Sequence, residues 1–176
     1  AIHRKLYPFF AQTFIHDSYS CQLGKGTHKA LERFKRFGYT VSKNNTKQCW
    51  ILKCDIKKFF ANIDHDILKQ ILKKHIEDFD TLWLLDRIID SFPQHLDVQH
   101  PSVGLSLGNL ASQLLVNIYM NEFDQFIKHT LKAKYYIRYA DDFVIMSPNK
   151  SELLNRIHHI PDHRVLRTAT KRRMLR

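Results

Sequence analysis

The sequence has 176 residues, 44% of them hydrophobic, which is enough to bury one sizeable core in a single domain. Its 28 Lys and Arg outnumber its 17 Asp and Glu, and the formal net charge of +11 favours an acidic partner, with nucleic acid first. The sequence shows no signal peptide and no apolar run near the ~20 residues of a membrane-spanning helix, so we expect no membrane partner. The three cysteines lack the paired spacing of a zinc site, and we expect a cytoplasmic protein.

The N-terminal part is expected to contain two helices joined by a glycine-containing loop. The chain begins at Ala1, without Met, inside what reads as a helix end over residues 6–10, which suggests a fragment or a processed product. Thr27 is the expected N-cap of the second helix and Gly38 its end. The apolar residues of this helix recur at helical spacing: Leu31, Phe34 and Phe37.

Lys25 lies in Gly24-Lys25-Gly26, just ahead of the N-terminus of this helix. Backbone N–H groups and a Lys at such a place can hold a phosphate, although the pattern by itself favours an ordinary loop. Basic residues off the apolar stripe form either a solvated face or a contact surface for template or primer phosphates: Lys29, Lys35 and Arg36. Asn44 and Asn45 then mark a turn, which we expect to join two strands.

A strand over residues 50–56 is expected to end near Asp55, where an apolar run stops. Asp64 is the expected N-cap of the next helix, and Asp66 reads as a second residue of the helix start. Phe60 would by default be a core aromatic side chain. Further apolar helices are expected over residues 81–92 and 110–133.

Residues 135–146 read as a β-hairpin whose short turn carries Asp141 and Asp142. Asp is a common turn residue, but adjacent carboxylates are costly unless a cation lies beside them. Together with Asp55, two neighbouring strands would present three carboxylates, which are the ligands that Mg²⁺ prefers. A pair of such ions about 3.5–4 Å apart can activate the attacking oxygen and stabilise the leaving oxygen of a phosphoryl transfer.

The segment Tyr139-Ala140-Asp141-Asp142 resembles the Y-x-D-D box of reverse transcriptases, and residues 55–60 resemble the earlier palm motif of the same enzymes. The resemblance implies RNA-directed DNA synthesis from template RNA, a primer and dNTPs, with two Mg²⁺ ions, or Mn²⁺ in their place. It makes Asp55, Asp141 and Asp142 the catalytic metal ligands, assisted by the Ile56 carbonyl. It implies that Lys25 binds the incoming triphosphate. It also implies that Phe60 lies beneath the sugar, where a bulky residue excludes a 2′-hydroxyl.

The segment from Leu107 to Gln113 resembles the motif that most reverse transcriptases write as Q-G-x-x-x-S-P, with Leu107 for Gln and Gln113 for Pro. This variant, with the Gly-Lys-Gly-Thr-His segment, is similar to the reverse transcriptases of diversity-generating retroelements. That group copies with errors opposite adenine, and losing the Gln amide removes an interaction worth about 1–3 kcal/mol of discrimination. The resemblance implies that Leu107, Gly108 and Gln113 face the nascent pair, and it adds a small basic accessory protein as a partner.

The resemblance covers residues 14–147 and implies an α/β (α+β) fingers–palm fold, in which a mainly antiparallel sheet is backed by helices. Residues 1–50 and 80–110 are expected to be fingers-like, residues 51–79 and 111–160 palm-like, and residues 161–176 a basic, nucleic-acid-binding tail. No thumb domain is recognisable in the sequence. Two alternatives stay open: a group II intron-type or other bacterial reverse transcriptase, and a truncated, catalytically silent nucleic-acid-binding remnant. Each would belong to a bacterial, archaeal or phage-infected cell.

Overall fold

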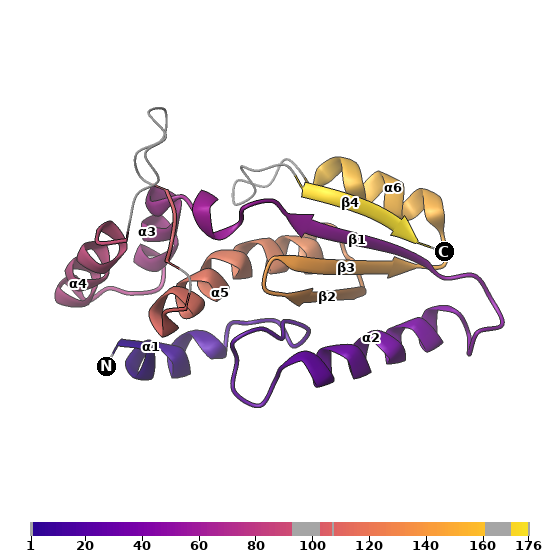
Figure 1. Cartoon of the computed structure of the whole chain (residues 1–176), viewed down its shortest axis with the longest axis horizontal. Coiled ribbons are helices and arrows are strands. Elements are labelled where there is room, and N and C mark those ends of the chain that lie inside the picture. Colours follow the sequence, from indigo (N-terminus) through magenta and orange to yellow (C-terminus); the bar gives the residue numbers. More distant parts are fainter. Residues whose placement is uncertain (1, 93–102, 107, 161–169, 176) are drawn as a thin grey trace.

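The computed structural model describes residues 2–92, 103–106, 108–160 and 170–175. A four-stranded, fully antiparallel sheet lies at its centre, in the order β2-β3-β1-β4 (Figure 1). The strands are β1 (Trp50–Ile56), β2 (Tyr135–Tyr139), β3 (Asp142–Ser147) and β4 (Thr170–Leu175). The connection from β1 through α5 to β2 leaves β3 between the two strands that it joins, and the connection from β3 through α6 to β4 leaves β1 between them. This is the split βαβ arrangement. The predicted antiparallel sheet backed by helices is confirmed.

Six α-helices surround the sheet within the described residues: α1 (Ile2–Ala11), α2 (Thr27–Val41), α3 (His65–Lys73), α4 (Phe79–Asp90), α5 (Leu110–Gln125) and α6 (Lys150–His159). A 3₁₀ turn, η1 (Phe60–Asn62), follows β1, and a π-helical turn, η2 (Phe126–Thr130), extends α5. Side-chain caps begin several of them: Asp64, as predicted, accepts a hydrogen bond from the Ile67 amide at 2.9 Å, and Asp78 accepts one from the Thr81 amide at 2.8 Å.

The two faces of the sheet differ in what covers them. One face carries the alternate residues of β1, Leu52, Cys54 and Ile56, which join the main hydrophobic core with α5, α3, α4 and α1. The other face is covered at one end by α2, whose Phe37 and Val41 pack with Ile137 and Met146. The end of this second face where β1 stops and β3 begins carries polar residues, and it is there that the predicted carboxylates lie.

Three local predictions need correction. The N-cap of α2 is Gly26, with φ of 139°, and Thr27 is the first helical residue. The helix continues through Gly38 to Val41, because packing of its last turn against the sheet outweighs the low helix propensity of glycine. Lys43, Asn44 and Asn45 all have positive φ, so the predicted turn is present, but it connects a helix to a strand.

The predicted basic tail is also different from the expectation. Residues 161–169 lie outside the described residues, but Thr170–Leu175 form β4, which pairs antiparallel with the outer edge of β1. The unpaired N–H and C=O groups of β1 explain this pairing, since an edge strand is a template for another extended segment. At least the end of the tail is therefore part of the sheet.

Candidate active site

The carboxylate-bearing strands place two of the predicted residues directly opposite each other. In the antiparallel register of β1 and β3, Asp55 is the cross-strand partner of Asp142, and Asp142 is in turn the partner of Tyr139 on β2. Directly paired residues project to the same face of a sheet. Asp55, Asp142 and Tyr139 therefore form one row across three strands on the face that α2 leaves partly open.

The turn between β2 and β3 consists of two residues, Ala140 and Asp141. Ala140 has a φ of 54°, in the left-handed region that disfavours a residue with a Cβ, whereas Asp141 has negative φ. A positive φ at the first loop residue alone is the pattern of a type II′ hairpin turn, which matches the twist of the strands. The turn holds Asp141 next to the row formed by Asp55 and Asp142.

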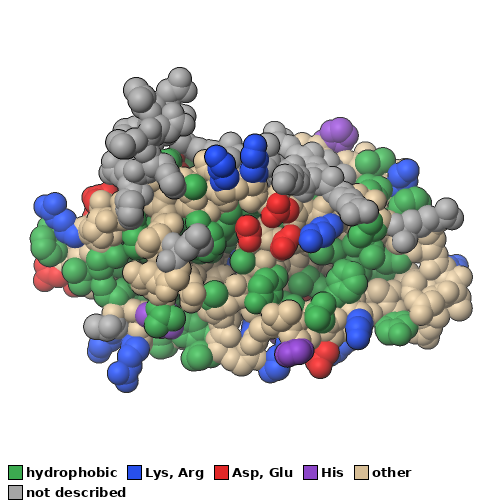
Figure 2. Space-filling view, viewed as in Figure 1, with side chains coloured by type: hydrophobic (Ala, Val, Ile, Leu, Met, Phe, Trp, Pro, Cys, Tyr) green, Lys and Arg blue, Asp and Glu red, His purple; other side chains and the backbone are tan. Residues whose placement is uncertain are grey.

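The charges of Asp55 and Asp142 act on Asp141. Burial raises the pKa of Asp141, and the negative charges of Asp55 and Asp142 raise it further, against the lowering effects of its own backbone N–H and of Arg138. Lys53, two residues before Asp55, lies 3.4 Å from an Asp142 oxygen. Figure 2 shows acidic side chains near the middle of this face with basic side chains beside them.

The donor chemistry of this cluster fits a hard divalent cation, because all its side-chain ligands are carboxylate oxygens. The Ile56 carbonyl, also predicted as a ligand, lies at the end of β1. Within the described part of the chain, however, no three His, Cys, Asp or Glu side chains stand close enough together to hold an ion. The Asp142 oxygen nearest Lys53 forms an exposed ion pair with its ammonium, so a cation bound there would compete with this ammonium.

Lys25, the residue predicted to hold a triphosphate, has an unexpected environment. Its ammonium donates to the carbonyl oxygens of Ile15 (3.3 Å), His16 (2.8 Å) and Ser18 (2.8 Å). An ammonium has three N–H donors, and all of them are engaged here. Burial lowers the Lys25 pKa, as does nearby Arg138, while Asp17 opposes them. Lys25 therefore ties together the loop that it belongs to, and a phosphate would have to replace one of these carbonyls.

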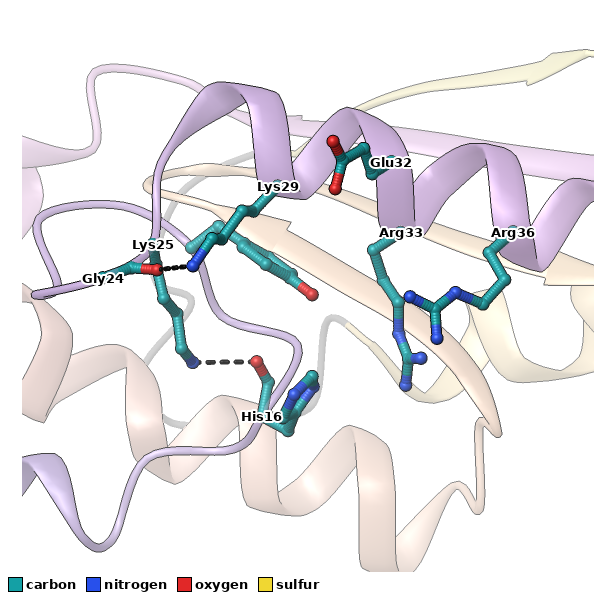
Figure 3. Close-up of a pocket in the computed structure, with 8 residues that line it drawn as sticks. His16, Gly24, Lys25, Lys29, Glu32, Arg33 and Arg36 are labelled. Carbon is teal, nitrogen blue, oxygen red and sulfur yellow. Dashed lines mark hydrogen bonds between the residues drawn. The ribbon is translucent and has the colours of Figure 1, made fainter.

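A basic pocket of about 530 Å³ lies between α2 and the loop that precedes it. Figure 3 shows Arg33 and Arg36 pointing from α2 toward His16, with Lys29 bonded to the Gly24 carbonyl. Arg33 is fastened by Asp17, whose two oxygens lie 2.7 and 3.4 Å from its Nε and Nη2. Lys29 and Arg36 are exposed, as is Lys35, which does not line this pocket. The predicted exposure of the three basic residues is confirmed, and their contact with nucleic acid stays a prediction.

The remaining predicted residues belong to η1, to the segment just before α5 and to the first turn of α5. Phe60 begins η1, is half-buried, and contacts the buried Phe59 edge to face at 5.6 Å between ring centroids. Gly108, with φ of 84°, precedes Asn109, whose side chain caps α5 by accepting from the Ala111 amide. Gln113 is half-buried in the first turn of α5. Leu107 lies outside the described residues.

The structure adds polar residues that the sequence reasoning missed. Arg138 on β2 and Asp124 on α5 form a completely buried ion pair of 2.8 Å. Asp17 is also buried, and it accepts from Arg33 and from Lys128, which lies 3.3 Å away. A signal for Arg138 existed, since a charged residue occupies an alternating position of an otherwise aromatic and apolar strand. No local pattern indicated its partners.

Comparison with known proteins identifies the family. The family described as reverse transcriptase (RNA-dependent DNA polymerase) matches residues 1–173, which is nearly the whole chain. The chain belongs to the reverse transcriptase family. Solved structures agree at the level of the fold: an apo telomerase from Candida tropicalis, truncated from its C-terminal domain, superposes with a TM-score of 0.65 at 13% identity, over 99% of this chain and 39% of the telomerase.

Two relatives show how this reverse transcriptase chain compares with longer proteins. The protein YkfC of Escherichia coli is 28% identical over 123 residues, or 68% of this chain and 31% of YkfC. The group II intron-encoded protein LtrA of Lactococcus lactis is 28% identical over 167 residues, or 94% of this chain and 26% of LtrA. The chain thus spans about a third or less of the length of these relatives. None of its described helices is both long and apolar enough to cross a membrane.

Proposed function

We propose that this chain carries the catalytic centre of an RNA-directed DNA polymerase that copies template RNA into cDNA. The observation that supports this most strongly is the register that sets Asp55 opposite Asp142, beside the turn that carries Asp141, in a chain that matches the reverse transcriptase family. In this proposal a primer end and a triphosphate meet at the carboxylates, on the face of the sheet that α2 leaves partly open. The clustered negative charge is stabilised when divalent cations bind there.

In this proposal Asp55, Asp141 and Asp142 hold Mg²⁺ or Mn²⁺, with the Ile56 carbonyl as a further ligand. When bound, such ions lower the pKa of an attacking hydroxyl and stabilise the charge on the leaving oxygen. Phe60, at the start of η1, limits the space beneath the sugar and selects dNTPs. Lys25 contributes to the triphosphate site, either by direct contact after giving up a carbonyl or by shaping the loop around it. The exposed basic residues of α2 contact the phosphates of template or primer: Lys29, Lys35 and Arg36.

The finer class that we propose is the error-prone reverse transcriptase of a diversity-generating retroelement, working with a small basic accessory protein. The support is the motif that runs from Leu107 and Gly108 to Gln113, in which an apolar residue stands where most of the family has Gln. The similarity to LtrA over 94% of this chain favours the second candidate, a group II intron-type enzyme. A Leu107→Gln variant separates the two, because restoring an amide should reduce misincorporation opposite template adenine by roughly 10-fold if the apolar residue causes it.

Primer extension on an RNA template tests the central proposal. The wild-type chain should extend a DNA primer with dNTPs in the presence of Mg²⁺, and Asp141→Asn and Asp55→Asn should each reduce extension by at least about 100-fold, since every 1.4 kcal/mol of lost transition-state stabilisation is a factor of ten. A wild-type chain that binds primer–template but never extends it would identify a catalytically silent nucleic-acid-binding protein. An active Asp141→Asn variant would reject this carboxylate as a metal ligand.

A further inference from the structure

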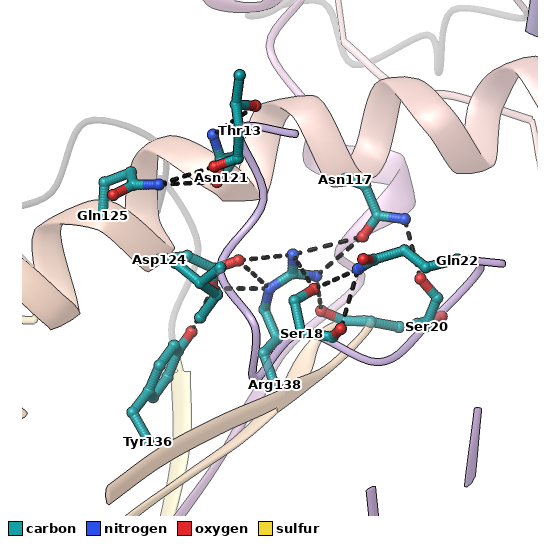
Figure 4. Close-up of polar contacts among 12 residues, drawn as sticks. Thr13, Ser18, Ser20, Gln22, Asn117, Asn121, Asp124, Gln125, Tyr136 and Arg138 are labelled. Carbon is teal, nitrogen blue, oxygen red and sulfur yellow. Dashed lines mark hydrogen bonds and ion pairs between the residues drawn. The ribbon is translucent and has the colours of Figure 1, made fainter. Parts of the chain in front are cut away.

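Arg138 is a charged side chain with no exposure to solvent, at the centre of the largest buried polar network in Figure 4. Its Nε and Nη2 donate to the two carboxylate oxygens of Asp124 on α5, each at 2.8 Å. Tyr136, two residues earlier on β2, donates its hydroxyl to the same carboxylate at 2.6 Å. This bidentate geometry fixes the plane of the guanidinium, because both oxygens and both nitrogens are used.

The fixed guanidinium reaches the hairpin turn through its remaining nitrogen. Nη1 donates to the carbonyl oxygen of Ala140 at 3.0 Å. Ala140 is the first of the two turn residues and has the unfavourable φ of 54°, and its carbonyl belongs to the peptide group that also contains the Asp141 amide. Holding this carbonyl fixes the orientation of that peptide plane, and with it the direction in which the Asp141 side chain leaves the backbone.

Two further contacts hold the guanidinium from the other sides. Nη2 also donates to the hydroxyl of Ser18 at 2.9 Å, and Asn117 on α5 accepts from Nη1 at 3.4 Å. Asn117 in turn donates to the Ser20 carbonyl at 3.0 Å, so the loop before α2 is tied to α5 around Arg138. The backbone of β2 pairs with the same loop, where the Arg138 amide donates to the Asp17 carbonyl and the Tyr19 amide to the Arg138 carbonyl, each at 3.0 Å.

We infer that Arg138 is a positioning residue that holds the Asp141 carboxylate in place for metal binding by bracing the Ala140 carbonyl against Asp124. The inference rests on the proposed function, in which Asp141 is a metal ligand. An ion pair that served only stability would need Asp124 alone, since its two oxygens already engage Nε and Nη2. The contact to Ala140 instead links a rigid, buried anchor to the peptide group that precedes the Asp141 Cα. Hydrogen bonds of this indirect kind orient metal ligands in many proteins.

Substitution of Arg138 by Lys separates bracing from charge pairing. A Lys ammonium can remain paired with Asp124, so no carboxylate is left buried without a counter-charge. The ammonium lacks the branched guanidinium group of Arg, however, and cannot contact Asp124 and Ala140 at the same time. The probe is Mn²⁺ alone, titrated into the full chain and followed by electron paramagnetic resonance. We expect Arg138→Lys to fold and to bind Mn²⁺ roughly 10-fold more weakly than the wild type, the size typical of losing an indirect hydrogen bond to a metal ligand. In primer extension kcat should fall while the KM for dNTP stays unchanged.

The matched control is Ser18→Ala, which removes a partner of Nη2 and leaves the Nη1 contact to Ala140 in place. It should leave the Mn²⁺ affinity within about twofold of the wild type, because Asp124 and Ala140 still hold the guanidinium. A second variant, Arg138→Gln with Asp124→Asn, keeps a hydrogen-bonded neutral pair without the reach to Ala140. It should show the same loss of Mn²⁺ affinity as Arg138→Lys. Circular dichroism establishes which variants are folded.

A measurement without substitution completes the test. The NMR resonance of the Arg138 Nη1–H that donates to Ala140 should shift in the wild-type chain as Mg²⁺ is added, since the bound ion changes the charge next to the peptide that the guanidinium holds. Wild-type Mn²⁺ affinity in a folded Arg138→Lys, or an Nη1–H resonance unmoved when the site is saturated, would overturn the inference while leaving the metal site intact. If instead the wild-type chain binds no Mn²⁺, or Asp141→Asn binds it as well, the proposed function fails first, and the inference with it.

Discussion

Asp55 lies directly opposite Asp142 in the register of β1 and β3, and Lys53 on the same face of β1 lies 3.4 Å from the Asp142 carboxylate. The structure thus provides a positive charge beside a carboxylate pair that would otherwise repel. Such a pair on a partly open face is destabilising for the free protein and becomes favourable when a cation binds. The cost of this arrangement should be measurable in the stability of the chain.

Asp141→Asn should change the response of the protein to Mg²⁺. The raised pKa of Asp141 means that its ionised form is disfavoured in the folded state, so the carboxylate reduces stability once the pH rises above its ordinary value of 3.8 and through its folded pKa. At neutral pH without divalent ions, Asp141→Asn should therefore unfold at a slightly higher temperature than the wild type. Adding Mg²⁺ to about 100 times its Kd should raise the wild-type Tm by roughly 5–10 °C and leave the variant unchanged.

Differential scanning fluorimetry at several Mg²⁺ concentrations makes this comparison. The control is Asp78→Asn, which removes another carboxylate on the α4 cap, distant from the sheet in Figure 1, and should not alter the Mg²⁺ response. Equal Mg²⁺ responses of wild type and Asp141→Asn would contradict the prediction.

Asp17→Asn should destabilise the protein in a pH-dependent way. Burial alone would raise the pKa of Asp17, but hydrogen bonds from Arg33 and His16 and the charges of Lys128 and Arg33 outweigh it and lower the pKa. The stabilisation from the ionised carboxylate is complete above the ordinary value of 3.8 and is lost as the pH falls through the lower folded pKa. We expect Asp17→Asn to cost about 1–3 kcal/mol at pH 7, less than a fully buried pair, because Arg33 and Lys128 are partly exposed.

Urea unfolding of wild type and Asp17→Asn between pH 3 and pH 7 gives the free energies of unfolding. The difference between the two proteins should shrink toward zero at the acid end. A difference that stays constant over this range would mean that Asp17 contributes through packing and not through its charge.

Local patterns in the sequence were sufficient to predict the elements that carry Asp55, Asp141 and Asp142. The hairpin around Asp141, the strand that bears Asp55 and the Asp64 cap all follow from short stretches of chain, and the structure confirms them. What the sequence did not indicate is non-local. β4 forms because β1, far away in sequence, has an unpaired edge. The buried position of Arg138 depends on Ser18 in a loop and on Asp124 in α5. Because α5 is buried nearly all round, its polar residues Asn117 and Asp124 show no surface stripe that would set them apart.

Phe60→Ala should relax the choice of sugar. If Phe60 limits the space beneath the 2′ position, its removal should increase ribonucleotide incorporation relative to deoxynucleotide by roughly 10–200-fold, the range for a pocket from which a steric barrier is removed. The measurement is primer extension with rNTP and dNTP in competition. The neighbouring Phe59 is a matched control: it is 4% exposed and belongs to the main core. Phe59→Ala should cost about 3–5 kcal/mol of stability without changing the sugar ratio. An unchanged ratio in Phe60→Ala would show that Phe60 is a packing residue.

The basic surface of α2 gives a prediction that holds whether or not the chain is catalytic. Lys35→Glu with Arg36→Glu should weaken binding to a primer–template duplex, because both side chains are exposed on α2, which lies along the lower edge of the molecule in Figure 1. Each phosphate that is no longer neutralised should reduce the slope of log K against log salt by about 0.9 on B-DNA, so the double variant should lower it by nearly 2, with a somewhat different value for a hybrid. Fluorescence anisotropy between low and moderate salt measures both quantities.

The controls for this last prediction follow from the structure. Arg87→Glu reverses a charge on α4, which lies at the opposite end from α2 in Figure 1 and where Arg87 is positioned over the Trp83 ring, so it should leave the salt slope unchanged. Deletion of the C-terminal tail is a less suitable comparison, since β4 pairs with β1 and its removal would expose the edge of the strand that carries Asp55. Because phosphate contacts position a duplex and do not read its sequence, the α2 variant should lose affinity equally for unrelated sequences. Salt-independent binding by the wild type, or an unchanged slope in the α2 variant, would contradict the prediction. Either result would mean that the basic residues of α2 do not contact the phosphates of the duplex.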